Sequence, residues 1–169
     1  DHYRRQCLIR LSGVSTLRDV VGCDALDRRR AQIRAWRRGN RERAGAWYEP
    51  GREPHAAGRV GRGFVGAESA ALWIRTEAEQ WWPAYAEASE LGEHETVVDV
   101  ADALHWYSDV WLSWGNWHRF FSLAVSAAQS LRNPKMEATH LGYLAWAEIV
   151  ETGDRDRAVL TARSALSAA

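Results

Sequence analysis

The chain has 169 residues, the length of one domain, and its 46% hydrophobic and 26% charged residues are typical of a folded globular protein. No apolar run reaches the roughly 18 residues that a membrane-spanning helix needs, and because the first ten residues are charged we expect no secretory signal there. The two cysteines, Cys7 and Cys23, cannot form a disulfide framework or a four-ligand zinc site. We therefore expect a cytoplasmic protein with a hydrophobic core.

The formal net charge is zero, yet the charges segregate along the chain. Residues 1–62 contain 15 basic and 7 acidic residues, whereas residues 63–169 contain 7 basic and 15 acidic residues. This asymmetry indicates either two halves that attract each other or a basic face exposed to solvent. The alternative interpretation is a basic arm that contacts phosphate or an acidic partner.

The sequence divides into three zones. Residues 1–44 are predicted to form a basic helical segment, and residues 45–67, with six glycines and two prolines, to form a linker. Residues 68–169 are predicted to be helical throughout. The arginines of the first zone that form a candidate basic patch are Arg28, Arg29, Arg30, Arg34, Arg37 and Arg38.

Five helices are predicted in the third zone, at 68–90, 94–113, 117–132, 134–151 and 155–168. Pro83 is expected to kink or break the first of them. Glycines with positive φ are expected after three helices, at Gly92, Gly115 and Gly153. The predicted N-cap residues are Asn116, Asn133 and Asp154. No segment alternates with a period of two, so we predict no sheet.

Recurring helical hairpins indicate a repeat protein. Gly115 and Gly153 are separated by slightly more than the roughly 34 residues of a tetratricopeptide unit. Ala158 and Ala165 supply small residues where adjacent helices would cross closely, and Trp146 and Ile149 are predicted to pack the first helix of the last hairpin on the second. We predict an all-α fold, a tetratricopeptide-like stack of antiparallel helical hairpins that forms a fragment of a right-handed α-solenoid. A helical bundle without repeats is the alternative.

Several packing motifs of residues 67–167 are shared with a known family. They are Ala71-Leu72-Trp73-Ile74 with Glu77, Ala84 and Ala88 before Leu91-Gly92, Val100 to Leu104 with Tyr107, Trp114 to Trp117, Ala127-Ala128, and Leu141-Gly142 leading to Gly153-Asp154. On these motifs, more than half of the chain resembles the tetratricopeptide region of actinobacterial signal-transduction ATPases of the NB-ARC type, which are transcriptional regulators.

This resemblance implies a non-catalytic interaction or sensor module of a signalling or transcription regulator. Its partner would be another protein or the adjacent domains of a longer parent chain, so we expect the chain to be a fragment. In the family a winged-helix segment precedes this region, and Asp1-His2-Tyr3 looks like the end of that segment. The family's nucleotide site lies outside the matched stretch.

Nucleotide-binding motifs are weak or missing. The chain has no G-x-x-x-x-G-K-[ST] motif. Gly61 to Gly66 has the spacing G-x-G-x-x-G, but an Arg- and Gly-rich stretch stands where a dinucleotide site requires a hydrophobic strand. We predict no cofactor.

Two pairs of a carboxylate and an imidazole suggest a metal site at first sight. Asp102 with His105, and Glu137 with His140, have the i, i+3 spacing seen in di-iron helical bundles. Such a site also needs a carboxylate from each remaining helix, and residues 110–136 contain no Asp or Glu. We therefore predict no metal site, and no set of nucleophile and base that would support catalysis.

The ten tryptophans and the last helix supply a candidate interaction surface. Its residues are Trp81, Trp82, Trp106, Trp114, Val159 and Leu166. At least one of the adjacent Trp81 and Trp82 should be partly exposed. We expect this surface to bind a protein, including a second copy through the C-terminal helix. The alternatives are a module that contacts nucleic acid through its arginines, and a small helical enzyme or ligand-binding protein that uses the Trp-rich hairpin.

Overall fold

The computed structural model describes residues 44, 47–48, 64 and 66–169. The elements in this part are α4 (Ala67–Thr76), α5 (Ala78–Glu90), α6 (His94–Ser108), the 3₁₀-helix η2 (Leu112–Trp114), α7 (Trp117–Ser130), α8 (Pro134–Ala147), the π-helix η3 (Glu148–Thr152) and α9 (Arg155–Ala168). No strand occurs among these residues, so the all-α prediction is confirmed there. None of the described helices is long and apolar enough to cross a membrane. The predicted basic patch, and nearly all of the predicted linker, lie outside the described residues.

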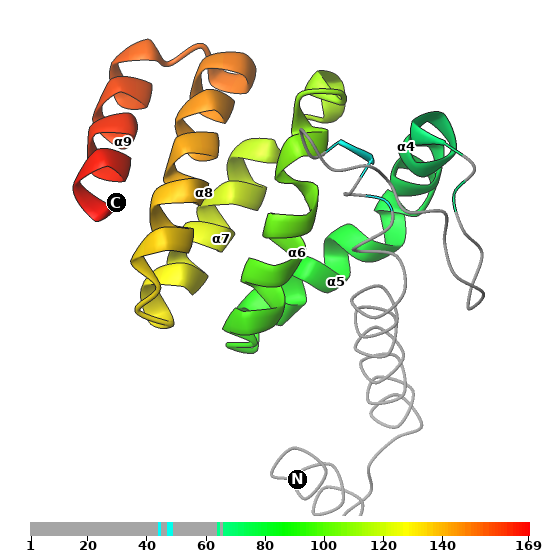
Figure 1. Ribbon diagram of the computed structural model, residues 1–169, viewed down its shortest axis with the longest axis horizontal. Coiled ribbons are helices and arrows are strands. Elements are labelled where there is room, and N and C mark those ends of the chain that lie inside the picture. Colours follow the sequence, from blue (N-terminus) through cyan, green and yellow to red (C-terminus); the bar gives the residue numbers. More distant parts are fainter. Residues whose placement is uncertain (1–43, 45–46, 49–63, 65) are drawn as a thin grey trace, which may run out of the picture.

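The helices from α6 to α9 lie side by side, and each runs antiparallel to the one before it (Figure 1). α7 packs between α6 and α8, and α9 packs against α8. Short connections make this arrangement the natural one for consecutive helices. The core lies between the helices and is lined by large buried side chains that include Ile74, Tyr85, Leu104, Tyr107, Trp117, Phe120 and Phe121.

The first predicted helix is divided in two, and the position predicted for the break is wrong. α4 ends at Thr76 and α5 begins at Ala78, while Pro83 lies inside α5. The indole Nε1 of Trp81 donates to the carbonyl oxygen of Ile74 at 2.8 Å, so a side chain satisfies a carbonyl group at the end of α4. An unpaired carbonyl near a helix end is costly when buried, and this contact supplies a partner for it.

The second predicted helix also ends early. α6 stops at Ser108 rather than at residue 113, and η2 follows before Gly115. The Ser108 hydroxyl donates to the carbonyl oxygen of His105 at 2.6 Å, and the Trp117 indole donates to that of Trp111 at 2.8 Å. Side chains thus bond carbonyl groups at the end of α6 and in the turn that follows.

The predicted helix-terminal residues are largely confirmed. Gly92, Gly115 and Gly153 have positive φ angles of 72°, 75° and 70°. Asn133 and Asp154 accept hydrogen bonds from the backbone of α8 and α9. Asn116 precedes α7 but makes no such bond. The carboxylate of Glu151 caps α7 instead. It accepts hydrogen bonds from the backbone N–H groups of Trp117 and His118, the first two residues of α7, at 3.0 and 2.9 Å.

One helical hairpin recurs along the chain. α5 ends at Glu90 and α7 at Ser130, while α6 begins at His94 and α8 at Pro134. The two pairs of helices are therefore shifted along the sequence by the same number of residues. The left-handed residue between the helices is Gly92 in one hairpin and Arg132, with φ of 52°, in the other. The spacing from Gly115 to Gly153, on which the sequence-based repeat was built, relates α7 to α9 rather than one of these two hairpins to the other. Buried pairs at equivalent positions are Ala84 and Ala124, Ala88 and Ala128, and Leu104 and Leu144.

The end of α8 contradicts the packing predicted for Ile149. Its side chain is 52% exposed, whereas Trp146 is partly buried against the core as predicted. The chain turns from α-helix to π-helix at Glu148, and the Glu148 side chain is fully buried. Leu141, Leu144 and Glu148 are spaced i, i+3 and i+7, so Glu148 continues the buried stripe and Ile149 lies beside it.

Small residues let α9 approach α8 closely. Ala158 is buried and Ala165 packs against the core, as predicted. Ala158→Leu should insert a larger side chain between α8 and α9 and lower the free energy of unfolding by about 1–3 kcal/mol. Urea unfolding measures this effect. Ala162→Leu, the same change at an exposed residue of the same helix, should change stability by less than about 0.5 kcal/mol. Equal effects at the two positions would contradict the assigned packing.

Candidate functional site

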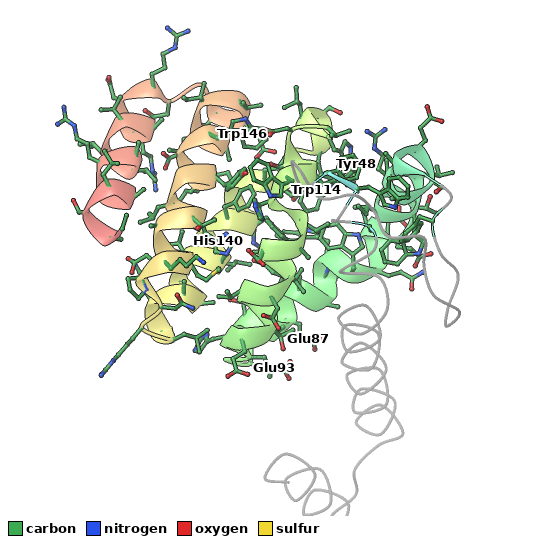
Figure 2. All side chains as sticks on the ribbon, in the orientation of Figure 1. Tyr48, Glu87, Glu93, Trp114, His140 and Trp146 are labelled. Carbon is green, nitrogen blue, oxygen red and sulfur yellow. The ribbon has the colours of Figure 1, made fainter. Side chains whose placement is uncertain are left out.

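The tryptophans predicted to form one interaction surface occupy different environments. Trp81 is buried, and Trp82 and Trp114 are half-buried. Their rings contact one another, with centroids 5.1 Å apart for Trp81 and Trp114 and 5.3 Å apart for Trp82 and Trp114. The ring of Trp114, which is labelled in Figure 2, also contacts that of Trp117, with a centroid distance of 4.5 Å. Aromatic rings at these separations pack against each other, so this cluster forms part of the core between α5, η2 and α7.

Arginines of the chain cover two half-buried tryptophans at the edge of this cluster. The guanidinium of Arg119 lies 5.6 Å from the ring centroid of Trp82, and that of Arg75 lies 5.7 Å from that of Trp111. A cation over an indole face within about 6 Å is attracted by the ring. Arg75 is held in place as well, since its Nε donates to the Tyr107 hydroxyl at 2.9 Å.

Trp106 lies apart from the cluster, on α6, and faces α8. Its ring centroid is 6.2 Å from that of Tyr143, and the two rings are nearly perpendicular. His105 lies against both rings, with centroids 5.0 Å from Trp106 and 4.9 Å from Tyr143. Trp106 and Tyr143 are both half-buried, so each keeps part of its ring at the surface.

Two carboxylates flank Trp106 on the same side of α6. Asp102, Trp106 and Asp109 are spaced i, i+4 and i+7, which places them in one row along the helix, and both aspartates are exposed. We call these three residues together with Tyr143 the Trp106 surface. Burial raises the pKa of Tyr143 to about 12, and the nearby charge of Asp109 adds to the increase. Asp109 therefore lies close enough to act on Tyr143 electrostatically.

The two predicted pairs of carboxylate and imidazole do not converge on one site. His105 Nδ1 lies 2.6 Å from the carbonyl oxygen of Asp102 and 4.0 Å from its carboxylate. The Glu137 carboxylate instead accepts from the side chain of Gln129 at 2.8 Å. In the part of the chain that the structure describes, no three His, Cys, Asp or Glu residues are grouped so as to hold a metal ion.

His140 is a polar side chain whose burial the sequence did not predict. It is fully buried in α8, and neither ring nitrogen has a hydrogen-bond partner. Its ring stacks on that of Phe121 at a centroid distance of 6.4 Å (Figure 2 labels His140). Burial lowers the pKa of His140 to about 4, and the nearby His105 adds to the shift. The buried Val100 stands in the equivalent position of the preceding hairpin.

Glu148 is a second buried polar group. Its Oε1 accepts from Arg157 Nε at 3.0 Å and lies 3.9 Å from His118 Nε2, whereas Oε2 has no partner. The ion pair joins η3 to α9, and His118 brings in α7. The sequence contains a signal for this burial, since Glu148 stands at position i+7 from Leu141 on the same helical stripe.

The outer face of α9 carries the last two predicted site residues. Val159 is 52% exposed and Leu166 is 81% exposed, and Leu160 between them is 63% exposed. Asp156 and Arg163 are exposed on the same face. We call these five residues the α9 outer face. It lies opposite the side of α9 on which Ala158 and Ala165 meet α8, and well away from Trp106, so the predicted surface is in fact several separate ones.

No known protein family, curated protein or solved structure matches the chain significantly.

Proposed function

We propose that the chain is a non-catalytic protein-interaction module built from tetratricopeptide-like helical hairpins. The observation that carries this proposal is the α9 outer face, where three large aliphatic side chains are exposed together. Exposed apolar patches of this kind mark sites of protein association. The resemblance to transcriptional regulators of the signal-transduction ATPase class makes a signalling or transcription regulator the proposed setting.

The recurrence of α5 and α6 in α7 and α8 supports a stack of hairpins. The interval from the end of α5, at Glu90, to the end of α7, at Ser130, exceeds the roughly 34 residues of a tetratricopeptide unit, so these would be long units. α9 follows α8 as α7 follows α6, and Gly153 precedes α9 as Gly115 precedes α7. Val159 therefore takes the position of the buried Phe121, and Leu166 that of the buried Ala128. The exposed side of α9 thus corresponds to a side of α7 that is buried.

The occupant that fits the α9 outer face is a second copy of the chain. Asp156, Val159, Leu160 and Arg163 are spaced i, i+3, i+4 and i+7, so they form one row. In an antiparallel pair of α9 helices, Asp156 of each copy would face Arg163 of the other, with Val159 and Leu160 at the centre. A two-fold interface requires such self-complementarity.

Sedimentation of the full chain tests the proposal. At high concentration the weight-average mass should rise from 19.1 kDa toward twice that value. Leu160→Glu and Leu166→Glu should hold the chain as a monomer, because a charge in the apolar row would be buried without a partner. Leu72→Glu, the same change at a leucine of α4 that is 67% exposed, should leave the association intact.

Reversal of the charges distinguishes this pairing from unspecific association. Arg163→Asp should weaken the dimer, and the double variant Asp156→Arg with Arg163→Asp should restore it. A wild-type chain that stays monomeric at every concentration would contradict the proposed use of this face.

A further inference from the structure

We infer that the Trp106 surface binds an arginine side chain of a protein partner. The site comprises the exposed part of the Trp106 ring, the Tyr143 ring perpendicular to it, and the carboxylates of Asp102 and Asp109 on either side. The inference deepens the proposed function. It rests on that function only because the arginine is taken to belong to a protein partner. It concerns a different face from the one that would join two copies.

Two other half-buried tryptophans of the chain show how an arginine can lie over an exposed indole. Trp82 and Trp111 each have an arginine of the same chain over the ring, at 5.6 and 5.7 Å. Among the residues that the structure describes, no arginine or lysine lies over Trp106. Trp106 is half-buried like these two tryptophans, so part of its indole is open to solvent without the cation that Trp82 and Trp111 have.

The two carboxylates in the same row as Trp106 favour a cation as its ligand, and the sequence on both sides of Trp106 is acidic. Residues 76–118 contain no Arg or Lys and nine acidic residues, which are Glu77, Glu79, Glu87, Glu90, Glu93, Glu95, Asp99, Asp102 and Asp109. Asp102 and Asp109 lie in the same row as Trp106, one turn before it and one turn after it. An arginine over the ring could therefore pair with a carboxylate at the same time.

Guanidinium suits this geometry better than ammonium. A guanidinium group is planar, stacks on aromatic faces and binds carboxylates through two parallel N–H groups, whereas an ammonium group is a more strongly hydrated point charge. The Tyr143 ring is nearly perpendicular to the Trp106 ring, with an interplanar angle of 83°, so a guanidinium on the exposed part of the indole would be bordered by a second ring. We therefore expect arginine to bind more tightly than lysine.

Fluorescence anisotropy on the full chain tests this inference. The probes are a fluorescein-labelled peptide of alternating arginine and glycine and the same peptide with lysine. The arginine peptide should bind more tightly. Trp106→Leu should raise its Kd about two- to fivefold, as expected for a cation–π contact at a partly exposed site. The double variant Asp102→Asn with Asp109→Asn should raise the Kd by a similar factor.

A control variant separates the site from the overall charge of the chain. Glu68→Gln with Glu79→Gln removes two exposed carboxylates from α4 and α5 and should leave the preference for arginine unchanged. Equal affinities for the arginine and lysine peptides, equal effects of the two double variants, or an unchanged Kd for Trp106→Leu would overturn the inference. None of these outcomes bears on the sedimentation test, which addresses the proposed function separately. Circular dichroism of each variant checks that it is folded.

Discussion

Mild acid should destabilise the protein because His140 must become charged inside the core. The pKa of His140 is lowered to about 4, whereas an unfolded chain titrates near the ordinary value of about 6.5. The unfolded state therefore binds more protons between these values, and stability falls as the pH falls through this window. From about pH 7 to about pH 5 the loss should be about 2 kcal/mol, and it should approach about 3 kcal/mol near pH 4.

The matched variant for this experiment is His140→Val, since valine occupies the equivalent position at Val100. Urea unfolding of both chains at the two pH values gives the contribution of His140 as a difference, in which the other titrating groups cancel. The variant should lose most of the pH dependence. It should also be at least as stable as the wild type at neutral pH, because it removes two buried nitrogen atoms without partners. Parallel pH profiles for the two chains would show that His140 is not buried in the neutral form.

The largest effect of a single substitution is expected at the ion pair between η3 and α9. Arg157→Met would leave the fully buried carboxylate of Glu148 without its cation. Loss of one partner from a buried pair costs about 3–5 kcal/mol. The Arg157 side chain is 65% exposed, so its attraction is partly screened by solvent, and we expect a loss of about 2–4 kcal/mol.

A double-mutant cycle isolates this interaction. Glu148→Gln removes the buried charge, so Arg157→Met should cost much less in that background than in the wild type. Arg155→Met changes another exposed arginine of the same helix and should have little effect. If Arg157→Met and Arg155→Met lower the unfolding free energy equally, the buried pair contributes nothing to stability.

Local sequence patterns predicted most of the helical architecture. Trp117, Phe120, Phe121 and Ala124 recur with a helical period in the sequence, and all four are buried. The glycines with positive φ and the caps at Asn133 and Asp154 also follow local rules. These features depend on residues close together in the chain, which is why they are readable without a structure.

The errors arise where a particular side-chain contact, rather than local propensity, decides where a helix ends or how it is capped. Pro83 was the obvious breaker, yet the chain divides at Glu77, where the indole of Trp81 reaches back to α4. The cap of α7 comes from Glu151, which lies in η3, beyond the whole of α8. Local propensities cannot reveal such partners.

The candidate site shows the same division. The sequence identified Trp106 and Leu166 as surface candidates, and both keep exposed area. It could not tell Trp106 from Trp81, because the difference lies in which rings of other helices cover them. Tyr143 and Asp109 were missed, since their proximity to Trp106 follows from the packing of α6 beside α8.

Binding of arginine at the Trp106 surface is tested most directly by NMR. The full chain is titrated with the arginine–glycine peptide, and the indole N–H signals of its ten tryptophans are followed. Single Trp→Phe variants assign the signals. We expect the signal of Trp106 to shift progressively, while that of the fully buried Trp117 stays in place and the lysine peptide causes smaller shifts. A titration that moves the signals of Trp82 and Trp114 but leaves that of Trp106 unchanged would contradict binding at the Trp106 surface.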